Sequence, residues 1–127
     1  MTRPSRSALI VSDSAPLRRY AAASLETAGF SCTEAASGYL AIDRLSERLF
    51  ALYVVDLDMP QSDGVSIFAI AMKSRDPSPV TIGLSRRPEA EARAGAWSST
   101  LFSEVLSLPV QPDVLASAAR DAVAAKN

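Results

Sequence analysis

The sequence contains no histidine and only one cysteine, Cys32. Histidine is the commonest general base and the commonest zinc ligand, so a Ser-His-Asp or Cys-His catalytic site is excluded. A single cysteine cannot form a disulfide within the chain, which fits a reducing compartment. Cys32 falls in a segment with strand character, and we expect it to be an inert packing residue rather than a reactive thiol.

Lysine is also scarce, since only Lys73 and Lys126 are lysines among 13 basic residues, and 14 acidic residues bring the net charge to -1. This balance argues against nucleic acid or an anionic membrane as the main partner, because both attract a basic surface. No apolar run is long enough to span a membrane, and the run "ALIV" after the basic start is too short for a signal-peptide core. We expect a cytoplasmic protein with residues 1–6 as a disordered lead.

The composition is that of one ordinary globular domain. The chain has 127 residues, of which 48% are hydrophobic and 21% are charged. This length allows one sizeable core, and this balance is too apolar for a disordered chain. Because there is no linker, internal repeat or low-complexity segment, we expect a single domain over residues 7–125.

Short apolar runs alternate with helical patterns along the whole chain. Strands are predicted over 8–11, 30–35, 51–56 and 80–85, and within 104–109. Helices are predicted over 15–29, 37–49, from Asp63 as N-cap, over 88–99 and over 112–125. Five successive strand–helix units predict an α/β fold, a doubly wound (βα)5 domain with a five-stranded parallel sheet in the flavodoxin-like order 2-1-3-4-5.

Acidic residues follow two of the predicted strands. The stretch "ALYVVDLDMPQSDGV", residues 51–65, ends an apolar strand in Asp56, and Asp13 follows the first strand. In parallel sheets ligands bind beyond the carboxyl ends of the strands, so these two carboxylates are expected to lie close together. They repel each other unless a cation lies between them, and magnesium suits such oxygen ligands. An aspartate beside a metal can also act as a nucleophile toward a phosphoryl donor.

The segment "VVDLDMPQSDG" resembles the signature of response-regulator receiver domains, with strand, acceptor aspartate, Met-Pro and Asp-Gly at the family's spacing. "DSAPLRRYAAASLETAGF" resembles the family's first loop and helix, and "AASGYLAI" resembles its second strand-to-helix turn. The resemblance covers roughly residues 7–125. It implies that a histidine kinase, a phosphotransfer protein or a small phosphodonor passes a phosphoryl group to Asp56.

The resemblance also implies which positions surround the acceptor. Magnesium would be held by two acidic residues after the first strand, by the acceptor, and by a backbone carbonyl two residues beyond it. The matching positions are Ser12, Asp13, Asp56 and Asp58. A serine or threonine after the fourth strand and a lysine before a proline would contact the phosphoryl oxygens. The matching positions are Ser85 and Leu108.

Several of these positions depart from the family pattern. Ser12 replaces an acid, which weakens magnesium binding, although serine can still hold a metal-bound water. Leu108 replaces the lysine and removes a charge-assisted contact worth about 1.5–3 kcal/mol. Val105 replaces the aromatic residue that reports the phosphorylated state, and Arg86 follows Ser85 where a small residue is usual. We therefore predict a degenerate receiver, or pseudo-receiver, with weakened magnesium binding.

Each candidate residue also has a plain structural interpretation. Asp56 is either a weak phosphoacceptor or only a carboxylate hydrogen-bonded at a strand end. Asp13 either contacts a metal or caps the first helix. We expect the side chain of Asp58 to be solvated in its loop, and Ser85 to be an ordinary strand-end hydroxyl once the lysine is missing.

A basic patch is predicted at the start of the helix over 88–99. Arg86, Arg87 and Arg93 form either a solvated face or a site for an anion, such as a second messenger, because guanidinium groups suit phosphate. Trp97 lies just beyond and is either half-packed or part of a partner surface.

The leading hypothesis is an atypical receiver that acts as an interaction module with impaired or absent phosphorylation. Its partner face would combine the helix over 88–99, the strand within 104–109 and the helix over 112–125. This face would bind a histidine kinase, a phosphotransfer protein, another signalling protein or a second copy as a homodimer. The alternative is a functional phosphoacceptor modified at Asp56.

A magnesium-dependent aspartyl phosphatase is rejected, because the Asp-x-Asp of that family follows its first strand. No enzymatic activity is expected beyond accepting a phosphoryl group.

Overall fold

The computed structural model describes residues 6–60, 64–74, 79–88 and 102–126. The strands are β1 Ser7–Val11, β2 Ser31–Ala35, β3 Leu52–Asp56, β4 Thr81–Ser85 and β5 Glu104–Ser107. The helices are α1 Ala15–Glu26, α2 Gly38–Glu47, α3 Val65–Lys73 and α5 Pro112–Lys126. The helix predicted over 88–99 lies outside the described residues, except for Pro88. Within the described ranges, no helix is long and apolar enough to cross a membrane.

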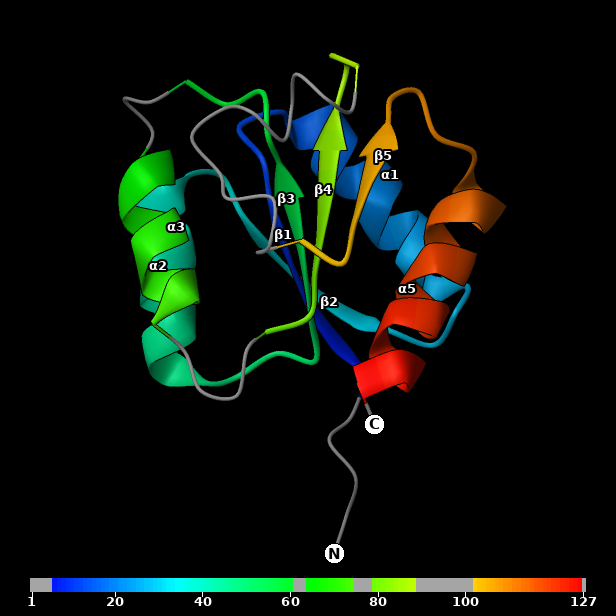
Figure 1. Cartoon of the computed structure of the whole chain (residues 1–127), viewed down its shortest axis with the longest axis horizontal. Coiled ribbons are helices and arrows are strands. Elements are labelled where there is room, and N and C mark those ends of the chain that lie inside the picture. Colours follow the sequence, from blue (N-terminus) through cyan, green and yellow to red (C-terminus); the bar gives the residue numbers. More distant parts are fainter. Residues whose placement is uncertain (1–5, 61–63, 75–78, 89–101, 127) are drawn as a thin grey trace, which may run out of the picture.

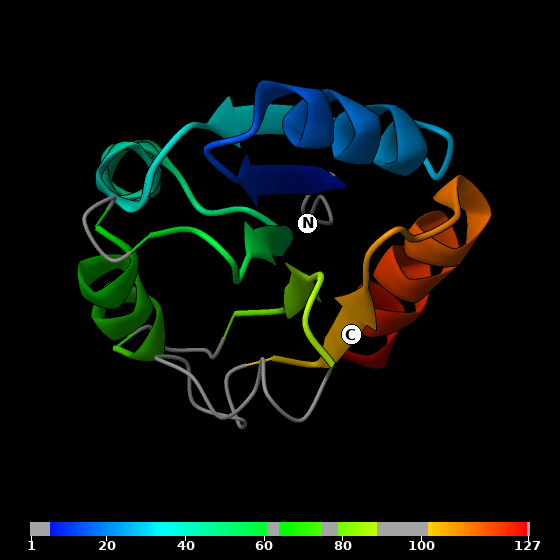
Figure 2. The same ribbon diagram turned by 90° about the horizontal axis from the view of Figure 1, so that it is seen from above.

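All five strands are parallel and follow the order β2-β1-β3-β4-β5, which confirms the predicted topology. Helices α1 and α5 cover one face of the sheet, and α2 and α3 cover the other (Figure 1). The view from above shows the sheet lying between these two pairs of helices (Figure 2). Because β3 lies between β1 and β4, the residues that follow these three strands meet at one edge of the sheet.

The central strands are buried on both faces, as their continuous apolar runs predict. In β1, Leu9 and Val11 belong to the core on the α2 and α3 side. Ala8 and Ile10 alternate with them and belong to the core on the α1 and α5 side. The more polar β2 forms an edge of the sheet and is only partly buried. The carboxyl edge therefore belongs to strands that have a hydrophobic core on each face.

Helix α2 ends earlier than predicted. It stops at Glu47, so Leu49 lies outside the helix and is 66% exposed. Arg48 takes an extended backbone conformation, and its guanidinium carbon lies 4.7 Å from the centre of the Phe50 ring. This cation–π contact accompanies the turn into β3, where Phe50 is buried. The prediction of a helix to residue 49 was therefore wrong by two residues.

Helix α3 begins at Val65 with Gly64 as its N-cap. Gly64 has a φ of +82°, a left-handed conformation that glycine adopts without steric cost. The helix start was predicted at Asp63, which lies outside the described residues. The observed cap is a glycine without a side-chain hydrogen bond, so the prediction of an aspartate cap does not match the helix start.

Candidate functional site

Asp56 is the last residue of β3 and is only 4% exposed. The hydroxyl of Ser12 donates a 2.7 Å hydrogen bond to Oδ2 of Asp56, and the backbone N–H of Asp58 donates a 2.9 Å bond to Oδ1. Burial raises the pKa of Asp56, although these two hydrogen bonds oppose the rise, and the charges of Asp58 and Asp13 add to it. Both oxygens of the candidate acceptor thus already have a partner from their own chain.

Asp13 lies at the same edge, as the strand pattern predicts. It is exposed, and its negative charge contributes to the raised pKa of Asp56. It does not cap the first helix, since that position belongs to Ser14, whose hydroxyl accepts a 3.2 Å bond from the Leu17 N–H. The alternative interpretation of Asp13 as a helix cap was therefore wrong. Asp13 remains available for a metal or for solvent.

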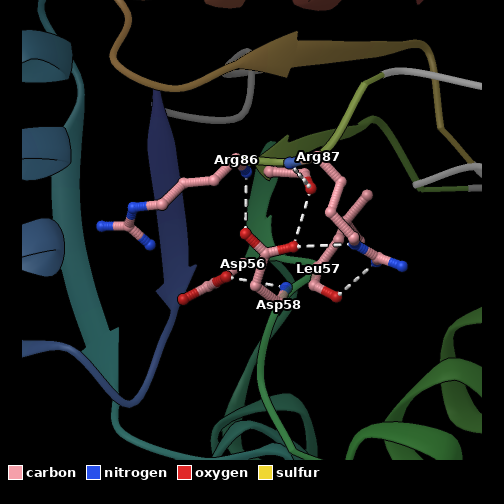
Figure 3. Close-up of polar contacts among 6 residues, drawn as sticks. Asp56, Leu57, Asp58, Arg86 and Arg87 are labelled. Carbon is pink, nitrogen blue, oxygen red and sulfur yellow. Dashed lines mark hydrogen bonds and ion pairs between the residues drawn. The ribbon is translucent and has the colours of Figure 1, made fainter. Parts of the chain in front are cut away.

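The side chain of Asp58 is hydrogen-bonded to the chain and only partly exposed, so the expectation of a solvated loop residue was wrong. Its Oδ1 accepts a 2.7 Å hydrogen bond from the Ser85 hydroxyl and a 3.2 Å bond from Nε of Arg87. Its Oδ2 accepts a 2.7 Å bond from the backbone N–H of Arg86 (Figure 3). Burial raises the pKa of Asp58, but the hydrogen bonds from Arg86, Ser85 and Arg87 outweigh it, and the net pKa is lowered. A bonded carboxylate therefore lies beside the candidate acceptor.

Ser85 is fully buried at the end of β4 and serves as a junction in this network. Its hydroxyl donates to Asp58 and accepts a 3.0 Å hydrogen bond from the N–H of Arg87. The Arg87 guanidinium also donates a 3.3 Å bond to the carbonyl oxygen of Leu57. Ser85 is thus more than an ordinary strand-end hydroxyl, because it links the segment after β3 to the segment after β4.

The two neighbouring arginines have different roles. Arg87 pairs with Asp58, whereas the Arg86 side chain is exposed and extends away from that carboxylate, on the opposite side from the Arg87 guanidinium (Figure 3). Only the backbone of Arg86 contributes to the network. The predicted patch therefore contains one paired and one solvent-facing arginine. The other members of the patch, Arg93 and Trp97, lie outside the described residues.

Leu108 lies beside Ser85, where the family pattern places a lysine. Its backbone N–H donates a 2.8 Å hydrogen bond to the Ser85 carbonyl oxygen, and its side chain packs against the core on the α1 and α5 side. Val105 is buried in β5 and packs into the opposite core. Aliphatic side chains thus occupy the positions where the family pattern has a lysine and an aromatic residue.

Arg18 is a residue of this edge that sequence reasoning missed. Its Nη1 donates a 2.8 Å hydrogen bond to the carbonyl oxygen of Ser12, and its Nε pairs with Glu34 at 3.0 Å. This contact ties the first turn of α1 to the ends of β1 and β2. Nothing in the local sequence marks an arginine for such a contact.

The carboxylates at this edge do not form a three-acid cluster. Among residues 6–60, 64–74, 79–88 and 102–126, no group of three His, Cys, Asp or Glu side chains is placed to hold a metal ion. Asp13 and Asp56 approach each other, but Asp58 directs its carboxylate to Ser85 and Arg86. The residues present therefore match only part of the acidic set that the resemblance implies.

Comparisons with known proteins agree with this fold. The response regulator receiver protein CpdR of Brucella abortus (strain 2308) is 36% identical over 59 residues, which are 46% of this chain and 49% of that protein. The aligned part thus spans about half the length of this relative. A sensor protein from Polaromonas sp. JS666 has a TM-score of 0.82 and 23% identity, covering 99% of this chain and 100% of that one. The chemotaxis response regulator CheY4 of Vibrio cholerae has a TM-score of 0.78 and 21% identity, and the match covers 93% of this chain and 98% of that one.

At these identities the solved structures establish the fold alone, and the family follows from a separate comparison. The family model of the response regulator receiver domain matches residues 8–120, which is most of the chain. Receiver domains are signalling modules of two-component systems rather than enzymes, and they interact with histidine kinases or phosphotransfer proteins. The chain belongs to the response regulator receiver family.

Proposed function

We propose that this receiver domain acts as an interaction and regulatory module in which aspartyl phosphorylation of Asp56 is impaired or absent. The observation that carries the proposal is the engagement of Ser85, whose hydroxyl donates to Asp58 at 2.7 Å. A phosphoryl group on Asp56 would need a hydrogen bond from that hydroxyl. To obtain it, the phosphoryl group would have to displace the Asp58 carboxylate, which the folded chain already holds in place.

The charge balance at the edge supports the same proposal. A phosphoryl group adds a charge of about -1.5 to -2 at neutral pH. It would arrive between Asp13 and Asp58, whose negative charges already raise the pKa of Asp56. Leu108 supplies no cation, and a charge-assisted hydrogen bond is worth about 1.5–3 kcal/mol. Because about 1.4 kcal/mol corresponds to a tenfold change in rate, its loss slows phosphorylation by roughly tenfold or more.

Weakened magnesium binding follows from the same residues. Asp13, the carboxylate of Asp56 and the carbonyl oxygen of Asp58 would hold the ion, which when bound would screen the charge of a phosphoryl donor. Ser12 cannot replace the missing carboxylate, and its hydroxyl already donates to Asp56. We therefore propose that this domain binds magnesium weakly.

The proposed partners are a histidine kinase, a phosphotransfer protein or another signalling protein in the cytoplasm. We propose β5 and α5 as the described part of the partner face expected from the sequence, also for a homodimer; the rest of that face, residues 89–99, lies outside the described residues. Two features of the described part of this face support the assignment. β5 is an edge strand of the sheet, and Val114 on α5 is 46% exposed.

A second candidate function is a working phosphoacceptor. The position of Asp56 favours it, because its carboxylate ends β3 beside the fully buried Ser85 of β4, as phosphoryl transfer in this family requires. In this case a donor would have to expel Asp58 from Ser85 before the product could be stabilised.

Intact-mass measurement after incubation with acetyl phosphate and magnesium separates these two functions. We expect the gain of a phosphoryl group in the wild type to be slow and far below stoichiometric, under conditions that fully modify an ordinary receiver. Asp56→Ala is the control for modification at other sites. Stoichiometric gain in the wild type that Asp56→Ala abolishes would overturn the proposal and establish the working phosphoacceptor.

A further inference from the structure

Three donors on consecutive residues converge on one carboxylate. The Ser85 hydroxyl and the Arg86 backbone N–H each donate to Asp58 at 2.7 Å, and Nε of Arg87 donates at 3.2 Å. They approach both oxygens, since two donate to Oδ1 and one to Oδ2. A hydroxyl, a backbone N–H and a guanidinium on adjacent residues form a binding site for an oxyanion of any source.

The donors also have contacts other than those with Asp58. Ser85 is fully buried at the end of β4, and the N–H of Arg87 donates to its oxygen at 3.0 Å, which leaves the hydroxyl hydrogen free for Asp58. The Arg87 guanidinium is braced by a 3.3 Å hydrogen bond to the Leu57 carbonyl oxygen. Such preorganisation lowers the conformational entropy that anion binding would otherwise cost.

The carboxylate is held in position as well. The N–H of Asp58 donates to Asp56 at 2.9 Å, and the preceding Leu57 is buried. Leu57 lies close to β4 because Gly83 has no side chain, and a Cβ atom there would lie 2.7 Å from Cδ1 of Leu57. The segment after β3 therefore lies against β4 and presents Asp58 directly to the donors.

We infer that Asp58 is an intramolecular occupant of an oxyanion site formed by Ser85, Arg86 and Arg87, and that it latches residues 85–87 in one arrangement. This inference deepens the proposed function, on which it rests, because it names the group that closes the site. The anion that the site would otherwise take is a tetrahedral oxyanion of the phosphate class. The surface around Arg86 and Arg87 thus adopts its arrangement through the contact with Asp58, without phosphorylation of Asp56.

Inorganic phosphate is the probe that tests the latch. In two-dimensional amide NMR spectra of the whole chain at constant ionic strength, we expect Asp58→Ala to show saturable phosphate-induced shifts at residues 85–87. Its dissociation constant should be at least about tenfold lower than that of the wild type, as expected when a charge-assisted competitor is removed. The double variant Asp58→Ala/Ser85→Ala should lose this gain in phosphate affinity. Asp121→Ala, which removes an exposed carboxylate of α5, should behave as the wild type.

Amide hydrogen exchange of the wild type provides a measurement that needs no variant. The Arg86 N–H should exchange slowly although its side chain is exposed, because Asp58 accepts its hydrogen. A rate equal to that of an unprotected peptide amide would overturn the inference. A folded Asp58→Ala that binds phosphate no better than the wild type would do the same.

The latch and the proposed function can fail separately. If acetyl phosphate modifies wild-type Asp56 stoichiometrically, the proposed impairment of phosphorylation is wrong, whatever phosphate does in Asp58→Ala. If Asp58→Ala gains no phosphate affinity while the wild type still resists acetyl phosphate, the latch is wrong and the proposed function stands. In that case the resistance would come from the missing lysine, the neighbouring negative charges and the weakened magnesium binding.

Discussion

The hydroxyl of Ser12 donates a 2.7 Å hydrogen bond to Asp56 across a sequence separation of 44 residues. It joins the end of β1 to the end of β3 where the family pattern would place a second carboxylate. A neutral donor there stabilises the ionised form of Asp56 without a metal ion. The edge of this sheet therefore balances part of its charge with hydrogen bonds from its own chain.

Ser12→Ala should lower the free energy of unfolding by about 1.5–3 kcal/mol, because a hydrogen bond to a buried charged group is lost. Urea unfolding at neutral pH measures this loss. Ser46→Ala is the matched control, since the hydroxyl of Ser46 makes its hydrogen bond on the exposed surface of α2 and should change stability by less than about 0.5 kcal/mol. Equal effects of the two substitutions would contradict the assigned role of Ser12.

Asp56→Asn should stabilise the domain at neutral pH by on the order of 1 kcal/mol, because it removes a buried charge. The folded pKa of Asp56 is raised, so its contribution to stability is present below the unfolded pKa of 3.8 and is lost as pH rises through the folded pKa. The advantage of the variant should therefore be absent in acid and grow with increasing pH. Unfolding curves of both proteins, measured between about pH 3 and about pH 8, test this pH dependence. A raised carboxyl pKa falls within this range. A variant advantage that is constant with pH would be inconsistent with a raised pKa.

The placement of the candidate residues at one edge was predictable, because apolar runs fix where β1, β3 and β4 end. Asp13, Asp56 and Ser85 accordingly lie at one edge of the sheet. The direction of the Asp58 side chain was not predictable. It depends on the pairing of Asp56 with Leu84 and on partners 27 to 29 residues further along the chain. No local pattern records such a contact.

The early end of α2 was unpredictable for a similar reason. The spacing of Leu45 and Leu49 fits a helix, yet the chain leaves the helix at Arg48. The guanidinium of Arg48 over the Phe50 ring and its 3.3 Å hydrogen bond to Thr33 are tertiary contacts. Such contacts override local helix propensity.

Leu108→Lys should restore a cation beside Ser85 and increase the rate of modification by acetyl phosphate by roughly tenfold or more. Leu108→Met keeps an apolar side chain of similar volume and should leave the rate unchanged. Intact mass against time gives both rates. A larger increase in Leu108→Lys/Asp58→Ala than in Leu108→Lys would indicate that Asp58 limits the reaction as well. No change in either lysine variant would show that a missing cation is not the obstacle.

Cys32 should be a slow nucleophile. Burial raises the pKa of its thiol to about 11, and the charges of Glu26 and Glu34 add to this rise. At about pH 8 its thiolate fraction is then roughly a hundredfold below that of a thiol with a pKa of 9.0. Alkylation by iodoacetamide, followed by mass spectrometry, should be slower than for glutathione by a similar factor and should accelerate toward pH 11. Rapid alkylation of the folded domain near neutral pH would refute the expectation of an inert thiol.

Gly64→Ala should destabilise the domain more than Gly29→Ala. Both glycines have a left-handed backbone, with φ of +82° and +86°, so both variants carry a backbone cost of about 1 kcal/mol. A Cβ atom on Gly64 would lie 2.8 Å from the Tyr39 ring, whereas one on Gly29 has nothing closer than 3.8 Å. Urea unfolding gives the difference. Tyr39→Ala in the Gly64→Ala background should recover the excess loss, and failure to recover it would exclude the Tyr39 contact as its cause.

The hydrogen bond between Asp58 and Ser85 has a further consequence, because both partners belong to one chain. An attached carboxylate competes with dissolved anions at an effective concentration on the order of millimolar or higher. This value is a property of the fold, so it does not fall when the domain is diluted or when phosphodonor levels in a cell decline. The competition by Asp58 for Ser85, Arg86 and Arg87 therefore does not weaken on dilution, and a partner or a substitution that moves Asp58 would remove it.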